Sequence, residues 1–187
     1  VNLAADAWSV SWSHTGNYLA GGVKNSAKEV IVYEFANEIL TEKDSLNLDN
    51  EAMFVRWHPE RMFLLVAGYN ILNTGDDWAM YELVSDSLVR RGSSNWAANS
   101  PGTKMFEWSL RRTGTANYYA FSFEDDLYIG EFNEGTDWNK TVTAASVSSI
   151  GTNINGLDWS PSGTSVALAC ENGTLKIYEF SGSALTL

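Results

Sequence analysis

Residues 157–180 read LDWSPSGTSVALACENGTLKIYEF and contain three short apolar runs separated by turn residues. Between the first two runs stands Ser-Pro-Ser-Gly, in which Pro presets the backbone for a tight turn and Gly tolerates a positive φ. Asn172-Gly173 separates the second run from the third, and Asn-Gly between two strand-like runs is a strong hairpin signal. This stretch therefore predicts three antiparallel strands.

The same pattern occurs four times along the chain. A marker Trp, at the end of the first run, and a closing Glu, in the third run, both recur. The markers are Trp12, Trp57, Trp108 and Trp159, and the closing residues are Glu34, Glu82, Glu131 and Glu179. Two markers in register, spaced close to 50 residues apart, indicate an internal repeat.

A more polar segment follows each third run, at residues 37–48, 87–91, 141–150 and 184–187. Its weaker apolar content suits an exposed outer strand. Each repeat is then a four-stranded antiparallel meander that cannot bury either face alone, and stacking such sheets around an axis gives a β-propeller. A helix is not favoured, because even the best candidate, residues 36–43, lacks a full apolar stripe.

We therefore expect an all-β chain, with one propeller domain at residues 1–187. Its four blades of four antiparallel strands are expected at approximately 7–50, 51–100, 101–150 and 151–187. Residues 1–6 resemble residues 46–51, the tail of an outer strand, so they are expected to close the fourth blade. Three arrangements stay open: a closed four-blade ring, two chains that complete an eight-blade ring, or part of a larger ring. The start at Val1 and the abrupt ends favour the last two.

These residues resemble the WD40-like family of β-propeller repeats. Trp159-Ser160-Pro161-Ser162-Gly163 is similar to the turn after that family's innermost strand, and the next two runs are similar to its second and third strands. The family's closing Trp-Asp is replaced by Tyr-Glu in three repeats and by Gly130-Glu131 in the other, and its Gly-His pair is absent. The paired glycines of Kelch-type propellers occur only at Gly21-Gly22. The resemblance implies a non-enzymatic interaction scaffold within a larger complex, whose partners are other protein subunits.

Composition narrows the classes of partner. The chain has 187 residues, a net charge of −11 and only 12 basic residues, which disfavours nucleic acid and anionic membrane surfaces. No apolar run is long enough to predict insertion into a membrane. The single cysteine, Cys170, ends an apolar run and is expected to be a buried thiol. A lone cysteine cannot form an intrachain disulfide, which weakly favours a reducing, intracellular compartment.

Catalytic patterns are weak, and no metal or other cofactor is expected. His14 and His58 both follow a marker Trp and are expected to be solvated turn residues, and no nucleophile elbow or phosphate-binding loop occurs. Acid pairs lie at two loop tips, Asp76-Asp77 and Asp125-Asp126. These acids are interpreted as turn residues. The alternative is an enzyme or glycan-binding propeller that uses these four acids as a site on its top face.

Unrepeated aromatic residues and one basic cluster are the best candidates for a partner surface. The marker Trp residues are expected in core or inter-blade packing, whereas loop Trp residues often mark contacts. Arg90-Arg91 reads either as a patch for an acidic partner or as solvated turn residues. The candidate contact residues are Trp78, Trp96, Trp138, Asp76, Asp77, Asp125, Asp126, Arg90 and Arg91.

Overall fold

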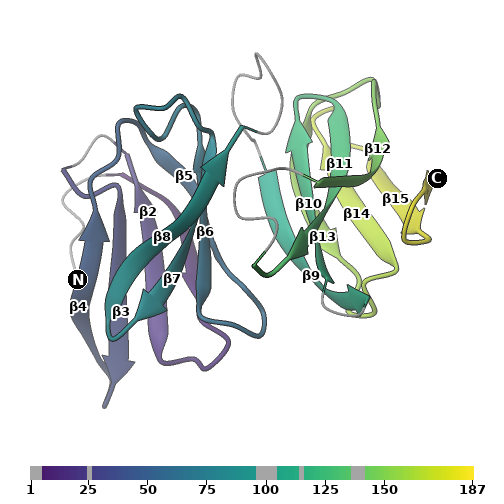
Figure 1. The fold of residues 1–187 in the computed structure, drawn as a ribbon. Helices are drawn as coiled ribbons and strands as arrows, with labels where there is room; N and C mark the ends of the chain where they lie inside the picture. Colours follow the sequence, from purple (N-terminus) through teal and green to yellow (C-terminus); the bar gives the residue numbers. More distant parts are fainter. Residues whose placement is uncertain (1–5, 25–26, 96–104, 114–115, 136–141) are drawn as a thin grey trace. The chain divides into compact units, whose positions relative to one another are not determined.

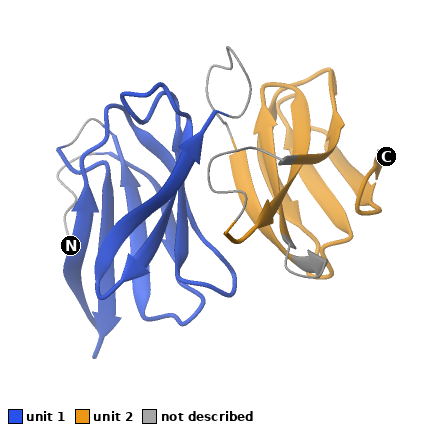
Figure 2. Cartoon of the chain, viewed as in Figure 1, with its two compact units in different colours: residues 1–98 blue, residues 99–187 orange. Residues whose placement is uncertain are grey.

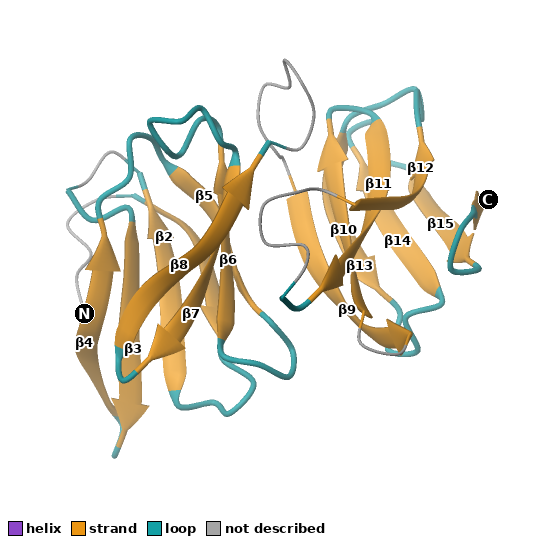
Figure 3. Cartoon of the chain, in the orientation of Figure 1, coloured by secondary structure: helices purple, strands orange, loops and turns teal. Residues whose placement is uncertain are grey.

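The computed structural model describes residues 6–24, 27–95, 105–113, 116–135 and 142–187. Within these ranges every regular element is a strand, and no helix is present (Figure 3). Residues 36–43, the best helix candidate, instead form the end of one strand, a two-residue turn and the first part of the next strand.

The strands form four antiparallel sheets, one for each repeat, and each sheet is hydrogen-bonded in chain order (Figure 1). Sheet 1 contains β1 (Ala7–Trp12), β2 (Tyr18–Val23), β3 (Val30–Ala36) and β4 (Ile39–Leu46). Sheet 2 contains β5 (Ala52–Trp57), β6 (Phe63–Gly68), β7 (Trp78–Val84) and β8 (Ser87–Ser94). Sheet 3 contains β9 (Met105–Thr113), β10 (Ala116–Phe123), β11 (Asp126–Asn133) and β12 (Val142–Val147). Sheet 4 contains β13 (Ile154–Trp159), β14 (Ser165–Cys170), β15 (Leu175–Phe180) and β16 (Leu185–Thr186).

The expected all-β fold of four four-stranded antiparallel blades is thereby confirmed. The predicted turns form as well: Gly163 donates its N–H to the carbonyl of Ser160 at 2.8 Å, and Gly173 adopts a φ of 80° after Asn172. Sheet 4 has the shortest outer strand, because β16 pairs with β15 only through Glu179 and Phe180. Residues 1–5 lie outside the described residues, so closure of this sheet by residues 1–6 stays a prediction.

The chain divides into two compact units, Val1–Ala98 and Asn99–Leu187 (Figure 2). Each unit contains two sheets. Side chains alternate between the two faces of a strand, so each sheet has a face that carries the marker Trp, called the Trp face, and an opposite back face.

In the first unit, the back face of sheet 1 packs against the Trp face of sheet 2. Val30 and Val32 of sheet 1 share a buried cluster with Val55, Trp57 and Leu64 of sheet 2. Hydrogen bonds join the two inner strands, because Ser9 Oγ accepts from the Val55 N–H at 3.1 Å and Ser11 Oγ accepts from the Trp57 N–H at 2.9 Å.

The second unit repeats this arrangement. Leu127 and Ile129, on the back face of sheet 3, lie in a buried cluster with Trp159 and Val166, on the Trp face of sheet 4. The indole N–H of Trp159 donates to the backbone carbonyl of Glu107 in β9 at 3.3 Å. Packing of a back face on a Trp face is thus the interface that the chain forms in each unit.

Candidate interaction surface

The paired acids of the first unit accept hydrogen bonds from their own loop and from β8. Asp77 is buried, and its carboxylate accepts from the N–H of Asn70 at 3.1 Å. The Asp76 carboxylate accepts from the hydroxyls of Thr74 at 2.6 Å and Ser93 at 2.7 Å. These contacts fix the loop before β7.

The paired acids of the second unit hold the link between its sheets. The Asp126 carboxylate accepts from the N–H of Ser149 at 2.8 Å, and the Asp125 carboxylate accepts from the N–H of Gly151 at 3.3 Å. Burial, and secondarily the charge of Asp126, raises the pKa of the neighbouring Tyr128. Within the described ranges, no group of three or more His, Cys, Asp or Glu side chains could hold a metal ion.

The sequence patterns did not single out Glu29, the acid of sheet 1 that corresponds to Asp77 and Asp126. Glu29 is buried, and its carboxylate accepts from the N–H of Leu48 at 2.8 Å in the link to sheet 2. Glu29 and Asp77 stand directly before a third strand, and Asp126 is the first residue of one. That shared position in three repeats is the sequence signal that could have identified Glu29. Glu29 and Asp126 also have the same role, because each holds the link to the next sheet.

The other candidate contact residues are dispersed. Trp78 is buried at the start of β7, so its side chain contributes to packing. Trp96 and Trp138 lie outside the described residues. Arg90 is exposed on β8, and Arg91 donates from Nε to the Glu82 carboxylate at 2.6 Å.

The structure confirms the prediction for the cysteine and contradicts the prediction for one of the two histidines. Cys170 is buried, as predicted. The expectation that both histidines are solvated is wrong for His58, which is buried with its ring 6.1 Å from that of Phe63 and with Nδ1 accepting from the Glu60 N–H. His14 is exposed. A turn between two strands of one sheet can point a side chain inwards, which sequence alone does not reveal.

A polar cluster joins the β7–β8 turn to sheet 1. Asp86 in that turn accepts from the Tyr18 hydroxyl at 2.7 Å and from Lys43 Nζ at 3.1 Å, and Lys43 also pairs with Glu34 at 2.9 Å. The bonds to Glu34 and Asp86 raise the pKa of Lys43 to about 12. The bonds from Tyr18 and then Lys43 lower the pKa of Asp86, and the bond to Asp86 raises the pKa of Tyr18.

The first strand of sheet 1 is exposed on its Trp face, unlike that of sheet 2, whereas Ile31 and Tyr33 on the third strand are buried. Trp12 is 50% exposed, whereas Trp57, at the same position of sheet 2, is 4% exposed. Val10 and Phe35 flank Trp12 on this face and are also exposed, and the Phe35 ring packs edge-on against Trp12 at 5.4 Å. Trp8, next on the strand, is exposed beneath the Lys24 ammonium, which lies 5.4 Å from its ring centroid. The expected packing of the marker Trp is confirmed for Trp57, Trp108 and Trp159, but in this structure Trp12 is not buried.

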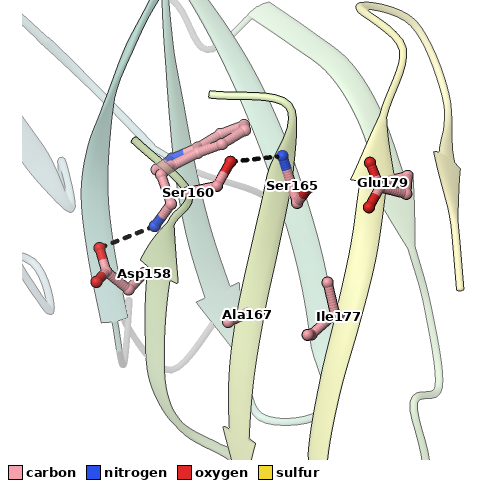
Figure 4. Close-up of a pocket in the computed structure, with 7 residues that line it drawn as sticks. Asp158, Ser160, Ser165, Ala167, Ile177 and Glu179 are labelled. Carbon is pink, nitrogen blue, oxygen red and sulfur yellow. Dashed lines mark hydrogen bonds between the residues drawn. The ribbon is translucent and has the colours of Figure 1, made fainter. Parts of the chain in front are cut away.

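The back face of sheet 4 is also exposed. Leu175 is 81% and Ile177 59% exposed, although Val30 and Val32 occupy the same positions of sheet 1 and are fully buried. A shallow groove runs over this face (Figure 4). Its lining residues are Asp158, Trp159, Ser160, Ser165, Ala167, Ile177 and Glu179.

These exposed residues were missed as contact candidates because they belong to the repeat. Trp8, Val10 and Trp12 alternate with serines, and Leu175 and Ile177 alternate with Lys176 and Tyr178. The alternation predicts apolar faces, but it does not say which faces are covered.

One family model matches part of the chain. Residues 140–179 match the family model "WD domain, G-beta repeat". This segment is a WD40 repeat. The match runs from β12, the outer strand of sheet 3, through β15 of sheet 4. No curated protein matches the sequence.

Solved structures confirm the propeller fold. The chain is similar to the crystal structure of Saccharomyces cerevisiae Sqt1 over 97% of its length, with a TM-score of 0.69 and 15% identity. It is similar to the β-propeller domain of Myceliophteria thermophila Cps50 (Swd1) over 93%, with a TM-score of 0.64 and 14% identity. The chain covers 50% of the first protein and 52% of the second, so it spans about half the length of each. In the described ranges, no helix is long and apolar enough to cross a membrane.

Proposed function

We propose that this WD40-like chain is a non-enzymatic protein-interaction scaffold that acts within a larger complex, with other protein subunits as its partners. The observation that carries the proposal is the exposed first strand of sheet 1, where Val10 and Trp12 lie on the Trp face and Phe35 packs against Trp12. A contiguous exposed apolar patch is typical of an interaction surface, and Trp is among the residues that contribute most to binding.

The loop acids support a scaffold over the alternative, an enzyme or glycan-binding propeller with an acidic site. Asp77, Asp125 and Asp126 accept hydrogen bonds from backbone N–H groups of this chain. Carboxylates held in this way stabilise loops, whereas a catalytic pair must face a substrate across a cleft. The contacts predicted at Arg90, Trp96 and Trp138 remain proposals.

The experiment is chemical cross-linking of the tagged chain in an extract of its source, with the linked peptides identified by mass spectrometry. We expect cross-links to a different protein at constant stoichiometry, and we expect them to disappear when an excess of untagged chain competes. Cross-links only within the chain, or only between copies of it, contradict the scaffold proposal.

A further inference from the structure

We propose that a pocket on the first unit binds a lysine or arginine side chain from a basic segment of a protein partner. The pocket has a volume of about 230 Å³ and is lined by Asn50, Glu51, Met53 and Tyr69. These residues come from the link into sheet 2, from β5 and from the start of the β6–β7 loop. The inference rests on the proposed scaffold function and deepens it, because it names the chemistry of one partner contact.

Tyr69 is a residue at which sheet 2 departs from the other sheets. The residue directly after the second strand is charged in each of the others, as Lys24, Glu124 and Glu171. Tyr69 puts an aromatic ring at this position, and it is 50% exposed. The chain itself holds the loop, because the neighbouring Asn70 donates its N–H to the Asp77 carboxylate at 3.1 Å. The pocket therefore presents an exposed ring from a loop that is fixed by hydrogen bonds.

Sheet 1 shows what the same two positions do when one of them is a cation. Trp8 and Met53 correspond, because each is the extra residue of a bulge in a first strand. In sheet 1 the Lys24 ammonium lies 5.4 Å from the centroid of the Trp8 ring, which is a cation–π contact. Sheet 2 has Met53 and Tyr69 at these positions, a thioether and a ring. A cation from a partner completes at Tyr69 the contact that Lys24 makes at Trp8.

Glu51 supplies a negative charge at the pocket. Lys24 Nζ lies 3.8 Å from Glu51 Oε1, and both side chains are partly exposed, so this ion pair is loose and contributes little. A carboxylate has two acceptor oxygens, so Glu51 can also pair with an incoming cation. Asn50 donates from Nδ2 to the Asn70 carbonyl at 3.1 Å, and its amide oxygen is a further acceptor. The pocket thus combines a ring face with acceptor oxygens.

The charges of the chain select the occupant. The chain has 23 acidic and 12 basic residues, a net charge of −11, which attracts a basic segment and repels an acidic one. None of the four lining residues is cationic. A lysine or arginine side chain can contact both the ring and the carboxylate through its charge, whereas a neutral or acidic side chain lacks the charge for either contact.

The test is fluorescence anisotropy with the full 187-residue chain and a dye-labelled peptide of alternating glycine and lysine. We expect this peptide to bind, and the same peptide with acetylated lysines to bind at least about 10-fold more weakly, because acetylation removes the charge. Tyr69→Leu removes the ring and Glu51→Gln removes the negative charge, so each should raise the dissociation constant about 3- to 10-fold. Tyr69→Phe keeps the ring and should bind as the wild type does.

Glu38→Gln is the matched control for Glu51→Gln. Glu38 is exposed in the β3–β4 turn and does not line the pocket, so its substitution changes only the net charge by the same amount. If Glu51→Gln weakens binding no more than Glu38→Gln does, the inference is overturned. It is equally overturned if Tyr69→Leu binds the peptide as tightly as the wild type.

Failure of the pocket and failure of the scaffold function give different results. A chain that cross-links to another protein, while Tyr69→Leu and Glu51→Gln bind the peptide normally, overturns the pocket but leaves the scaffold function standing. A chain whose peptide binding depends on both residues, but which cross-links to no other protein, supports the pocket and overturns the scaffold proposal.

Discussion

Sheets 1 and 2 carry the same Trp face but differ in what lies against it. Trp57 is buried beneath the back face of sheet 1, whereas Trp12 is half-exposed. Both residues end a first strand and face an aliphatic residue on the second strand and a Tyr on the third. Residue type and strand position are therefore equal, and the neighbouring sheet alone decides which Trp contributes to the core. Four predictions test this contrast between sheets 1 and 2 and related differences in the other sheets. They run from the largest expected effect on stability to the smallest.

The largest effect is expected from truncating the two Trp residues. Trp57→Ala removes a buried ring and should lower the free energy of unfolding by about 3–5 kcal/mol, the range for buried aromatic truncation. Trp12→Ala should cost the single chain less than about 1 kcal/mol, since the site is open to water. Urea unfolding of both variants measures the difference. Equal losses would contradict the contrast.

The Trp57 site also offers a finer test. Its indole N–H is buried without a hydrogen-bond partner. Trp57→Phe removes that N–H while keeping most of the ring, so it should cost much less than Trp57→Ala, because a buried unsatisfied donor is itself unfavourable. A loss as large as that of Trp57→Ala would show that the indole has a contact that this structure does not contain.

The second prediction compares sheet 3 with sheet 4. In sheet 3 the closing motif has Gly130 where sheet 4 has Tyr178, and the Tyr119 ring occupies that space. A Cβ on Gly130 would lie 2.0 Å from Tyr119 Cζ. Gly130→Ala should therefore lower the free energy of unfolding by about 1–3 kcal/mol, the usual cost of overpacking.

A compensating variant makes this prediction specific. Sheet 4 places Val166 opposite its Tyr178, so Tyr119→Val combined with Gly130→Tyr rebuilds the pair of sheet 4 in sheet 3. The double variant should be more stable in denaturant titration than Gly130→Tyr alone. No recovery would indicate that the backbone, not the Tyr119 ring, requires glycine here.

The third prediction concerns the buried acid that links sheets 1 and 2. Glu29→Ala leaves the Leu48 N–H without its acceptor and should cost about 1–3 kcal/mol of unfolding free energy. Hydrogen exchange of the Leu48 amide should accelerate with it. The matched control is Glu38→Ala in the exposed β3–β4 turn, which should change neither quantity.

The smallest effect is expected at the exposed Asp86 cluster. Because the folded-state pKa of Asp86 is lowered, its stabilisation is present above the unfolded-state pKa and is lost as pH falls through the folded-state value. Lys43 behaves oppositely: its stabilisation is present below its ordinary pKa and is lost as pH rises through about 12. Asp86→Asn should thus lower the melting temperature slightly near neutral pH, and this difference should vanish in acid. If the difference in melting temperature persists below the pKa of Asp86, it arises from the shape of the side chain and not from its charge.

The repeat pattern predicted most of the fold. Local signals gave the strands, because Asn-Gly and Ser-Pro-Ser-Gly define turns and alternation defines the two faces of each sheet. The interaction surface was harder to predict. Trp78 stood out because it does not repeat, yet it is buried, whereas Trp12 was assigned to packing and is half-exposed. Sequence position marks a face as apolar, but exposure depends on residues far away in the chain.

The amino-acid sequence by itself determined the strand order, the turns, the four-sheet repeat and the apolar character of both faces, because these follow from local backbone preferences and side-chain alternation. Only the tertiary structure decided which faces are covered, that the loop acids hold the chain's own backbone, and that His58 points inwards. Burial is a property of two surfaces brought together, so equivalent residues such as Trp12 and Trp57 can differ completely in environment.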